Sequence, residues 1–519
     1  MLRLFSTIFV FCFALNAYNQ NQNISQGNIF DGEPYLVINP NNSQHMVIAW
    51  MGFTVGNQIS IRTRVTFDAG ESWSPIETIP HAVVGFTSAD PCLAFNNDGY
   101  LYLSYIDYNS TTFSGAVRIR KSIDGGLSWE NSIEVISVSA DPGKRCIDRP
   151  WMAIDNSNGP NQGTIYITTM NAKGVTNTPF NPYLSRSHDY GQTWEPWRYL
   201  DSLYYLAGDL IAQPMPFPVV TSSGEFHAVY PSYVPTQNIF PRYILASSET
   251  GGISVYHQQV YAGNNSLNDT LAKKGYVLIS DPSSSDHLGF VFIADIYGDG
   301  DVFFIETYNN GDTWSLPYRV NDDPVGNNRM QDMVWADFDY DGDLVVSWRD
   351  RRNSVDTSYS AATEIWAAVR EEGSSTFLPN FQISTMQVQH NDVLNESGND
   401  FMCVKYFDDT LSTCWGDVRD GSMNIWFQRI LPNGEHVSIH QISSESLFGI
   451  EIYPNPTSTS ISISGENVLS YSVVDINGKL IPVNAVNNNK LDVSQLAPGI
   501  YFLSIQTSNG TVQKKFVVE

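Results

Sequence analysis

One pattern, Ser/Thr-x-Asp/Asn-x-Gly-x-x-Trp, occurs four times in this chain of 519 residues. Ser/Thr and Asp/Asn side chains bond nearby backbone groups and hold a turn. Glycine adopts backbone angles that other residues resist, and tryptophan can seal the turn against a neighbouring unit. Four copies of one turn predict a fold built from repeated units. The structural positions of the copies are Asp68, Trp73, Asp124, Trp129, Asp189, Trp194, Asn309 and Trp314.

The spacing of the copies predicts how many units the chain contains. They begin at residues 66, 122, 187 and 307, so the starts are 56, 65 and 120 residues apart. A decayed copy without its tryptophan lies inside the long gap at residues 247–252, and steps of similar size reach turns at residues 369–377 and 432–434. We expect seven units between about residues 33 and 442, or six if one unit is split to close a ring.

Each unit repeats the same order of parts: an apolar strand, a turn and a second apolar strand, then a strand entering the patterned turn and one leaving it. Residues 34–38 with 46–50 and residues 92–95 with 100–105 are two examples. Four short strands per unit, repeated radially, are typical of a β-propeller. The predicted fold is all-β, a seven-bladed or six-bladed propeller followed by a small C-terminal β-sandwich.

Propeller geometry predicts which end of the ring binds a ligand. The patterned turn is the third turn of a blade, so the opposite mouth is built from residues just before first strands and just after second strands. The positions before first strands also include Arg145, Arg329, Asp332 and Asp400. Candidate catalytic residues at the mouth are Asp148, Asp350 and Asp417, and candidate substrate-binding residues are Glu33, Asp90, Asp107, Arg149, Arg352 and Arg419.

A Trp-x-Asp-x-Arg pattern occurs twice at the mouth, at residues 348–352 and 415–419. Arginine suits carboxylate or sulfate ligands, and a neighbouring carboxylate can act as general acid or base. The alternative is that each Asp–Arg pair braces its own loop.

The repeated turn is the Asp box, or BNR repeat, and residues 30–445 resemble the sialidase-like β-propellers. The resemblance implies three arginines from different blades that bind a substrate carboxylate, with Arg149, Arg352 and Arg419 as the available set. It also implies a Tyr nucleophile helped by a Glu, and an Asp acid. The first inner strand, residues 33–40, departs from the family because it lacks the Arg-Ile-Pro motif.

Three functions remain open. The first is a sialidase-like, exo-acting glycoside hydrolase that acts on an extracellular glycan or glycoconjugate. The second is a polysaccharide lyase on uronate-containing polymers. The third is a non-catalytic glycan-binding adhesin of the cell surface. We expect the protein to act as a monomer, with no nucleic-acid partner and no transmembrane segment.

The charge of the chain excludes some classes of protein. With 54 acidic and 28 basic side chains, the formal charge is −26. Nucleic-acid binding requires a basic surface, which this composition does not provide. An aromatic content of 13% rules out a disordered acidic tail.

No cofactor is evident in the sequence, although calcium could bind one Asp-rich turn. Asp337, Asp339 and Asp341 fit the start of a calcium loop, but its twelfth position is Trp348 rather than Glu. The other interpretation is a solvated hairpin turn.

Cys403 and Cys414 flank a turn at Asp408 and Asp409. Pairing strands about that turn places the two cysteines directly opposite each other, within reach of a disulfide. Two packed free thiols are the alternative.

The two ends of the chain predict export. Residues 1–20 are typical of a signal peptide, with a basic Arg3 before a short apolar run. Residues 453–457, 474–478, 496–502 and 514–518 resemble the type IX secretion sorting domain of Bacteroidetes, which implies contact with that machinery and release or anchoring at the cell surface. A generic carbohydrate-binding sandwich is the alternative. The predicted domains are the signal peptide (1–20), the propeller (21–443) and the sorting domain (444–519).

Overall fold

The computed structural model describes residues 21–53, 58–263, 275–389, 399–437, 451–464, 468–475, 480–487, 489–507 and 510–518. The expected signal peptide lies outside these residues. The described residues form β-strands, turns and one short 3-10 helix, η1 (Pro235–Gln237). The all-β prediction is therefore confirmed.

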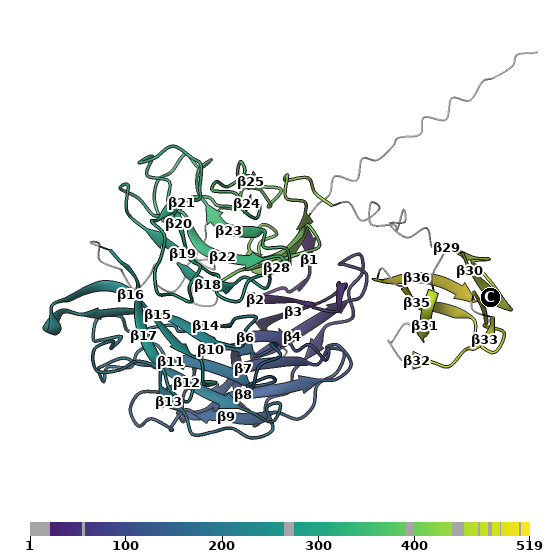
Figure 1. Cartoon of the computed structure of the whole chain (residues 1–519), viewed down its shortest axis with the longest axis horizontal. Helices are drawn as coiled ribbons and strands as arrows, with labels where there is room; N and C mark the ends of the chain where they lie inside the picture. The colour runs from purple at the N-terminus through teal and green to yellow at the C-terminus, as the bar shows by residue number, and fades with distance from the viewer. Residues whose placement is uncertain are drawn as a thin grey trace, which may run out of the picture.

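Seven four-stranded antiparallel sheets occupy the described residues between 22 and 430 (Figure 1). The first three sheets are β2 (Asp31–Asn39), β3 (Asn42–Phe53), β4 (Ile59–Thr66) and β5 (Glu77–Thr78); β6 (Thr87–Phe95), β7 (Leu101–Asn109), β8 (Ser114–Ser122) and β9 (Ile133–Ser137); and β10 (Asp148–Ile154), β11 (Ile165–Met170), β12 (Pro182–Ser187) and β13 (Arg198–Tyr199).

The next three sheets follow in chain order, and the seventh is completed by the first strand of the chain. The bounds are β14 (Phe217–Val220), β15 (Phe226–Val234), β16 (Ile239–Ser248) and β17 (Tyr256–Ala262); β18 (Tyr276–Ser280), β19 (Leu288–Ala294), β20 (Asp301–Thr307) and β21 (Tyr318–Arg319); β22 (Asp332–Phe338), β23 (Leu344–Asp350), β24 (Glu364–Arg370) and β25 (Phe381–Gln382); and β26 (Cys403–Phe407), β27 (Thr410–Asp417), β28 (Asn424–Ile430) and β1 (Gln22–Asn23).

The first strands of the sheets form a closed ring. Strands β2, β6, β10, β14, β18, β22 and β26 contact one another in this order, and β26 contacts β2. Strand β1 pairs with β28, so the two ends of the propeller share one sheet. Closure of this kind leaves only short, protected strand edges in a β-propeller.

Aromatic side chains fill the middle of the ring. The Trp151 ring lies 5.5 Å from Tyr35, 5.5 Å from Phe217, 5.7 Å from Trp335 and 4.9 Å from Phe401. These five residues come from five different sheets or the segments just before them, and all are buried. These rings form one aromatic cluster at the centre of the ring of blades.

The four patterned turns share one hydrogen-bond arrangement. The Thr66 hydroxyl donates to Asp68 Oδ1 at 2.7 Å, and the Gly70 and Ser72 amides donate to Thr66 Oγ1 and Asp68 Oδ1 at 2.9 and 2.8 Å. Each turn begins at the last residue of a third strand, as Thr66 does for β4. The decayed copy begins at Ser248 instead of residue 247, because the Gly252 amide bonds the Ser248 hydroxyl at 2.8 Å. These turns therefore serve the structure of the blades.

The C-terminal segment forms two further four-stranded sheets with a core of their own, which includes Ile461, Leu491 and Phe516. The strands alternate between buried and less buried residues, as a small sandwich requires. Their bounds are β29 (Glu451–Tyr453), β30 (Ser460–Ser464), β34 (Lys490–Asp492) and β33 (Asn484–Asn487); and β32 (Leu480–Ile481), β31 (Val468–Asp475), β35 (Gly499–Thr507) and β36 (Gly510–Val518).

The predicted disulfide is not formed. Cys403 and Cys414 lie directly opposite each other on β26 and β27, as expected, but both thiols are free and buried. The Cys403 thiol donates to the Leu36 carbonyl in the neighbouring sheet at 3.4 Å, so it points away from its cross-strand partner. Cys92 and Cys146 are also free and buried.

Candidate functional site

In three blades the first strand (β2, β6 or β10) has the same backbone distortion near its start, at one mouth of the propeller. Glu33, Asp90 and Arg149 have φ angles of 54°, 53° and 53°, and each precedes a proline. The pairing of each first strand with its second strand shifts register at this point. Such bulges re-aim side chains, and left-handed backbone at a non-glycine residue costs roughly 1–3 kcal/mol. The same step recurs at Met333 of β22, where the register also shifts, so it is a feature of the blades. In the three blades named above it places a charged side chain at the mouth.

The distorted steps bring three carboxylates around one guanidinium. Arg149 Nη1 lies 3.6 Å from Glu33 Oε1 and 3.8 Å from Asp90 Oδ1, and Arg149 Nη2 contacts Asp400. None of the four residues is more than 8% exposed. Because three acidic groups share one basic partner away from water, they cannot all be ionised cheaply. We call Glu33, Asp90, Arg149 and Asp400 the floor cluster.

Burial and neighbouring charges shift the pKa values of Glu33 and Arg149 in the floor cluster. Burial raises the pKa of Glu33 well above its ordinary value, and the Asp90 carboxylate adds to this rise while Arg149 opposes it. Burial by itself would lower the pKa of Arg149, but the surrounding carboxylates raise it above its usual range. Glu33 Oε2 is buried and has no hydrogen-bond partner among the described residues. Burial and the Asp90 carboxylate therefore favour the neutral form of Glu33.

The floor cluster lies in a pocket of about 560 Å³. Asp148 also lines the pocket and accepts a hydrogen bond from Gln213 at 2.5 Å. The pocket is also lined by Phe30, Phe53, Tyr108, Phe113, Arg145 and Lys173. Aromatic and apolar walls with a few convergent polar groups are typical of a small-ligand site.

The pocket and the patterned turns lie at opposite ends of the blades. Ile59 at the start of β4 lines the pocket, and Thr66 at the end of β4 begins the first patterned turn. Seven residue steps of extended chain separate them by about 23 Å. The patterned turns therefore lie at the end opposite the pocket, as expected, and ligand binding at the pocket end stays a prediction.

The two Trp-x-Asp-x-Arg patterns lie outside the pocket. The Trp348 indole donates to Asp350 at 2.6 Å, and the Arg352 amide and Nε donate to the same carboxylate at 2.6 and 2.9 Å. The guanidinium of Arg352 stacks 4.0 Å from the ring centre of Trp366. The hydrogen bonds of the Asp350 carboxylate are thus made to neighbouring residues of its own loop.

Asp417 repeats this arrangement in the next blade. It accepts hydrogen bonds from the Trp415 indole at 2.8 Å and from Arg419 Nη2 at 2.6 Å, and Arg419 stacks 4.3 Å from Trp426. In both blades the geometry is that of a loop brace. The structure therefore brings Arg149 to the pocket but does not bring Arg352 and Arg419 to it.

Asp107 points away from the pocket. Its carboxylate lies 2.9 Å from His81 Nδ1 and accepts bonds from the Ser88 hydroxyl and the Ala82 amide at 3.0 and 2.7 Å. The next residue, Tyr108, lines the pocket instead, because successive side chains of a strand face opposite sides.

The sequence analysis did not predict three of the residues that line the pocket: Gln213, Phe113 and Lys173. No motif marks them in the sequence.

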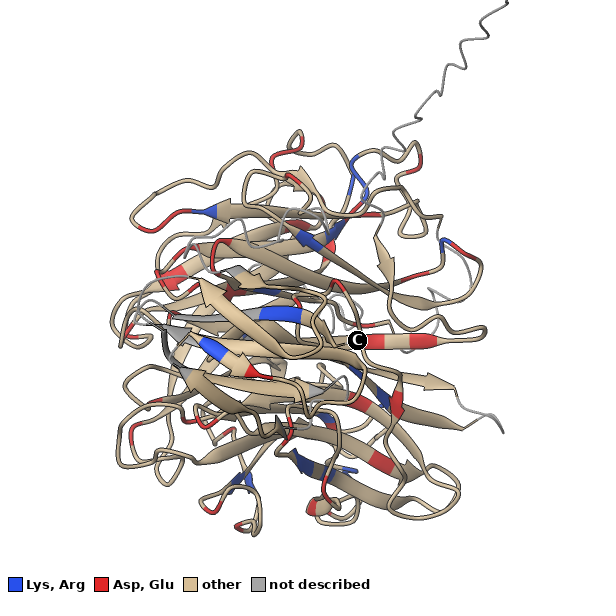
Figure 2. Ribbon diagram, turned by 90° about the vertical axis from the view of Figure 1, so that its right-hand side faces the viewer, with Lys and Arg blue, Asp and Glu red and all other residues tan. Residues whose placement is uncertain are grey.

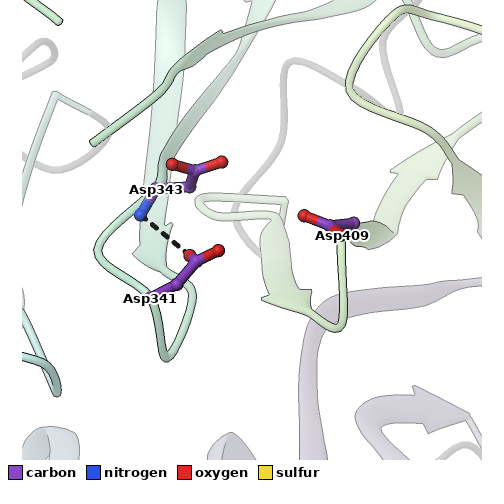
Figure 3. A group of neighbouring side chains, drawn as sticks. All are labelled: Asp341, Asp343 and Asp409. Carbon is purple, nitrogen blue, oxygen red and sulfur yellow. Dashed lines mark hydrogen bonds between the residues drawn. The ribbon is translucent and has the colours of Figure 1, made fainter. Parts of the chain in front are cut away.

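The predicted calcium ligands do not gather. Asp337 bonds Lys405 Nζ at 2.8 Å and the Tyr406 amide at 3.0 Å, and Asp339 accepts the Tyr340 and Asp409 amides. Among the described residues, the acidic group close enough to share a cation is instead Asp341, Asp343 and Asp409 (Figure 3). Asp341 accepts the Asp343 amide at 3.2 Å there, as in an ordinary turn.

The fold and the C-terminal segment define the class of this protein. A family model described as a secretion system C-terminal sorting domain matches residues 451–519, which confirms the expectation for this segment. The protein is a β-propeller that is exported to the cell surface or the extracellular space and engages the secretion machinery. The described residues contain no helix that is both long enough and apolar enough to cross a membrane.

Solved structures with a similar chain path include two glycosidases. A protein of unknown function from Dyadobacter fermentans shares 13% identity, covering 68% of this chain and 98% of its own, with a TM-score of 0.42. The Hadza microbial sialidase Hz136 shares 14% sequence identity, and the match covers 72% of this chain and 74% of the sialidase chain, with a TM-score of 0.41. An α-L-arabinofuranosidase from Fusarium graminearum shares 11% sequence identity, and the match covers 80% of this chain and 98% of the enzyme chain, with a TM-score of 0.45. No curated protein sequence matches the chain.

Proposed function

We propose that this protein is a secreted glycoside hydrolase, with Glu33 as general acid and Asp148 as the second carboxylate. The observation that carries the proposal is the pairing of two carboxyl groups in one pocket: Glu33, which is buried and whose pKa burial raises, and Asp148, which is less buried. Most glycoside hydrolases use two carboxyl groups, one protonated and one ionised.

The proposed roles follow from that pair. Glu33 donates its proton to the glycosidic oxygen as the bond between this oxygen and the anomeric carbon breaks. Asp148, which is less buried than Glu33, either takes a proton from the attacking water or attacks the anomeric carbon itself. The remaining acids of the floor cluster, Asp90 and Asp400, stabilise the positive charge that develops on the sugar ring.

The pocket favours a neutral sugar at the floor over a sialic acid. A sialic-acid carboxylate would need several free guanidinium groups, but Arg149 already faces three carboxylates and the other two candidate arginines are bound in loop braces. An anionic sugar placed at the floor would be repelled by Asp90 and Asp400. The exo-sialidase activity expected from the resemblance is thus the less favoured form of this proposal.

The lyase alternative is less favoured for a separate reason. A lyase needs a Tyr or His that takes a proton, and Tyr108 is the tyrosine that lines the pocket among the described residues. Burial raises the pKa of Tyr108, and Asp90 and Asp148 raise it further. A base that gives up its proton less readily is poorly suited to this step.

A panel of methylumbelliferyl glycosides, including the sialoside, tests the proposal, with uronate polymers assayed in parallel for new double bonds. We expect turnover of at least one neutral glycoside, and a loss of about 10²–10⁴-fold in kcat/KM for Glu33→Gln and for Asp148→Asn. Asp98→Asn, in an exposed turn at the other end of a blade, serves as the control. Binding of glycans without any turnover would reject the hydrolase and leave the adhesin.

A further inference from the structure

The rim of the pocket carries two basic side chains. Arg145 and Lys173 line the pocket. Within the part of the chain that the structure describes, neither has an acidic oxygen within 4.0 Å of its charged nitrogens. By contrast, Arg149, Arg352 and Arg419 are all ion-paired. We call Arg145, Lys173 and Phe113 the basic lip.

The guanidinium of Arg145 stacks on an aromatic ring. Its central carbon lies 3.9 Å from the ring centre of Phe113, whose side chain is 55% exposed. Stacking covers one face of the guanidinium and leaves the N–H groups along its edge without a protein acceptor in the described structure. An edge of this kind binds a carboxylate or sulfate through two parallel hydrogen bonds.

The charges of the pocket are separated in space. The acids of the floor cluster are almost fully buried, whereas Lys173 is exposed and Arg145 is partly exposed. The chain carries 54 acidic and 28 basic side chains, for a formal charge of −26, so its overall charge repels an anionic ligand. Acidic and basic residues lie on both strands and loops (Figure 2). Two cations beside the pocket, without an acidic partner among the described residues, therefore give it a local preference for an anion.

We infer that the basic lip is a subsite for an acidic group, a uronate carboxylate or a sulfate ester, on the sugar next to the one held at the floor. The inference rests on the proposed function and adds the substrate class. It also agrees with the chemistry of that function: the acidic floor stabilises the positive transition state, so an anionic group of the substrate must lie outside the floor.

The test measures binding to the full chain carrying Glu33→Gln, which prevents turnover. Calorimetry at low salt compares a neutral xylo-oligosaccharide, an oligogalacturonate and a sulfated chondroitin oligosaccharide of equal length. We expect one acidic ligand to bind about tenfold or more tightly than the neutral one, with the difference reduced in high salt. Adding Arg145→Gln and Lys173→Gln should remove the difference. The stronger of the two acidic ligands identifies the carboxylate or the sulfate as the source.

The control is Lys121→Gln. Lys121 makes a comparable contact, 3.7 Å from the ring centre of Tyr100, but does not line this pocket. Equal binding of neutral and acidic ligands, or a preference that survives the double substitution, would overturn the subsite. If the native protein turns over neutral glycosides and shows no acidic preference, the subsite alone fails. If acidic binding depends on Arg145 and Lys173 but no glycoside is hydrolysed, the hydrolase alone fails.

Discussion

Arg149 and Glu33 face each other in the floor cluster, with 3.6 Å between Nη1 and Oε1. Neither side chain is more than 5% exposed, and both residues carry left-handed backbone. The same guanidinium also serves Asp90 and Asp400. It is therefore the single basic group in the floor cluster that offsets mutual repulsion among three acids.

Replacing Arg149 by Met should destabilise the propeller, because it removes the cation that faces the buried acids Asp90 and Asp400. Removing one partner of a buried pair typically costs about 3–5 kcal/mol. Urea unfolding at neutral pH should show a decrease of this size in the free energy of unfolding, and Arg149→Lys should restore part of it. Wild-type stability for Arg149→Met would show that the carboxylates are already protonated or solvated.

Much of the fold follows from the sequence because the patterned turn is a local device. Its bonds join residues two to four positions apart, so the motif predicts its own geometry. A motif that recurs every sixty residues or so then places the blades. The decayed copy at Ser248 keeps the same Gly252 bond, which explains why the period continues through it.

The candidate site was only partly predictable, for reasons that Asp148 and Asp350 illustrate. Both lie at strand ends facing the same mouth, and position alone does not distinguish them. Asp350 is satisfied by Trp348 and Arg352 two residues away, whereas Asp148 bonds Gln213 from a distant loop and lines the pocket. Contacts between distant segments are not encoded in any local pattern.

The Asp-box carboxylate can be tested with a natural control. Asp68→Ala removes acceptors for the Ser72 amide and hydroxyl and for Thr66, so we expect a loss of about 1–3 kcal/mol in unfolding free energy. Asp68→Asn should cost far less, because Asn309 makes the equivalent bonds to Thr307 and Thr313 in another blade. Thermal and urea unfolding of both variants provide the measurement, and an equal loss in the two would contradict this explanation.

A buried histidine predicts how stability depends on pH. His287 lies 2.7 Å from Asp281 and 3.0 Å from Glu306, which also binds Arg370 of the next blade. Burial opposes protonation of His287, but the two carboxylates raise its pKa above 6.5. Its stabilising contribution is therefore complete below pH 6.5 and is lost as pH rises through the folded-state pKa.

The carboxylates of this group behave in the opposite sense. Burial would raise the pKa of Glu306, but His287 and Arg370 lower it to about 2. This contribution is complete above pH 4.5 and is lost as pH falls towards 2. Urea unfolding from pH 5 to 8.5 should show a difference between wild type and His287→Gln that is largest at the acidic end. His188→Gln, which removes a more exposed histidine, serves as the control substitution.

The four cysteines of the described chain should resist thiol reagents in the folded state. Burial raises the pKa of Cys403 to about 12 and that of Cys92 and Cys146 to about 11, so little reactive thiolate forms. Mass spectrometry after iodoacetamide should show labelling of these thiols only in denaturant. Resistance of Cys403 and Cys414 to labelling in denaturant without reductant would instead indicate the disulfide.

The first strand of the chain should be essential for a stable ring. Gln22 and Asn23 pair with Phe427 and Trp426, and the Gln22 side chain also receives a 3.1 Å bond from the Trp73 indole of the first blade. Deleting residues 21–24 removes the outer strand of the seventh sheet and leaves the edge of β28 unpaired, which exposes backbone donors and acceptors to solvent. We expect faster proteolysis near β28 and a lower melting temperature. Substituting both Gln22 and Asn23 by Ala keeps the backbone pairing and should cost less. Equal effects of the two changes would mean that the side chains, and not the strand, close the ring.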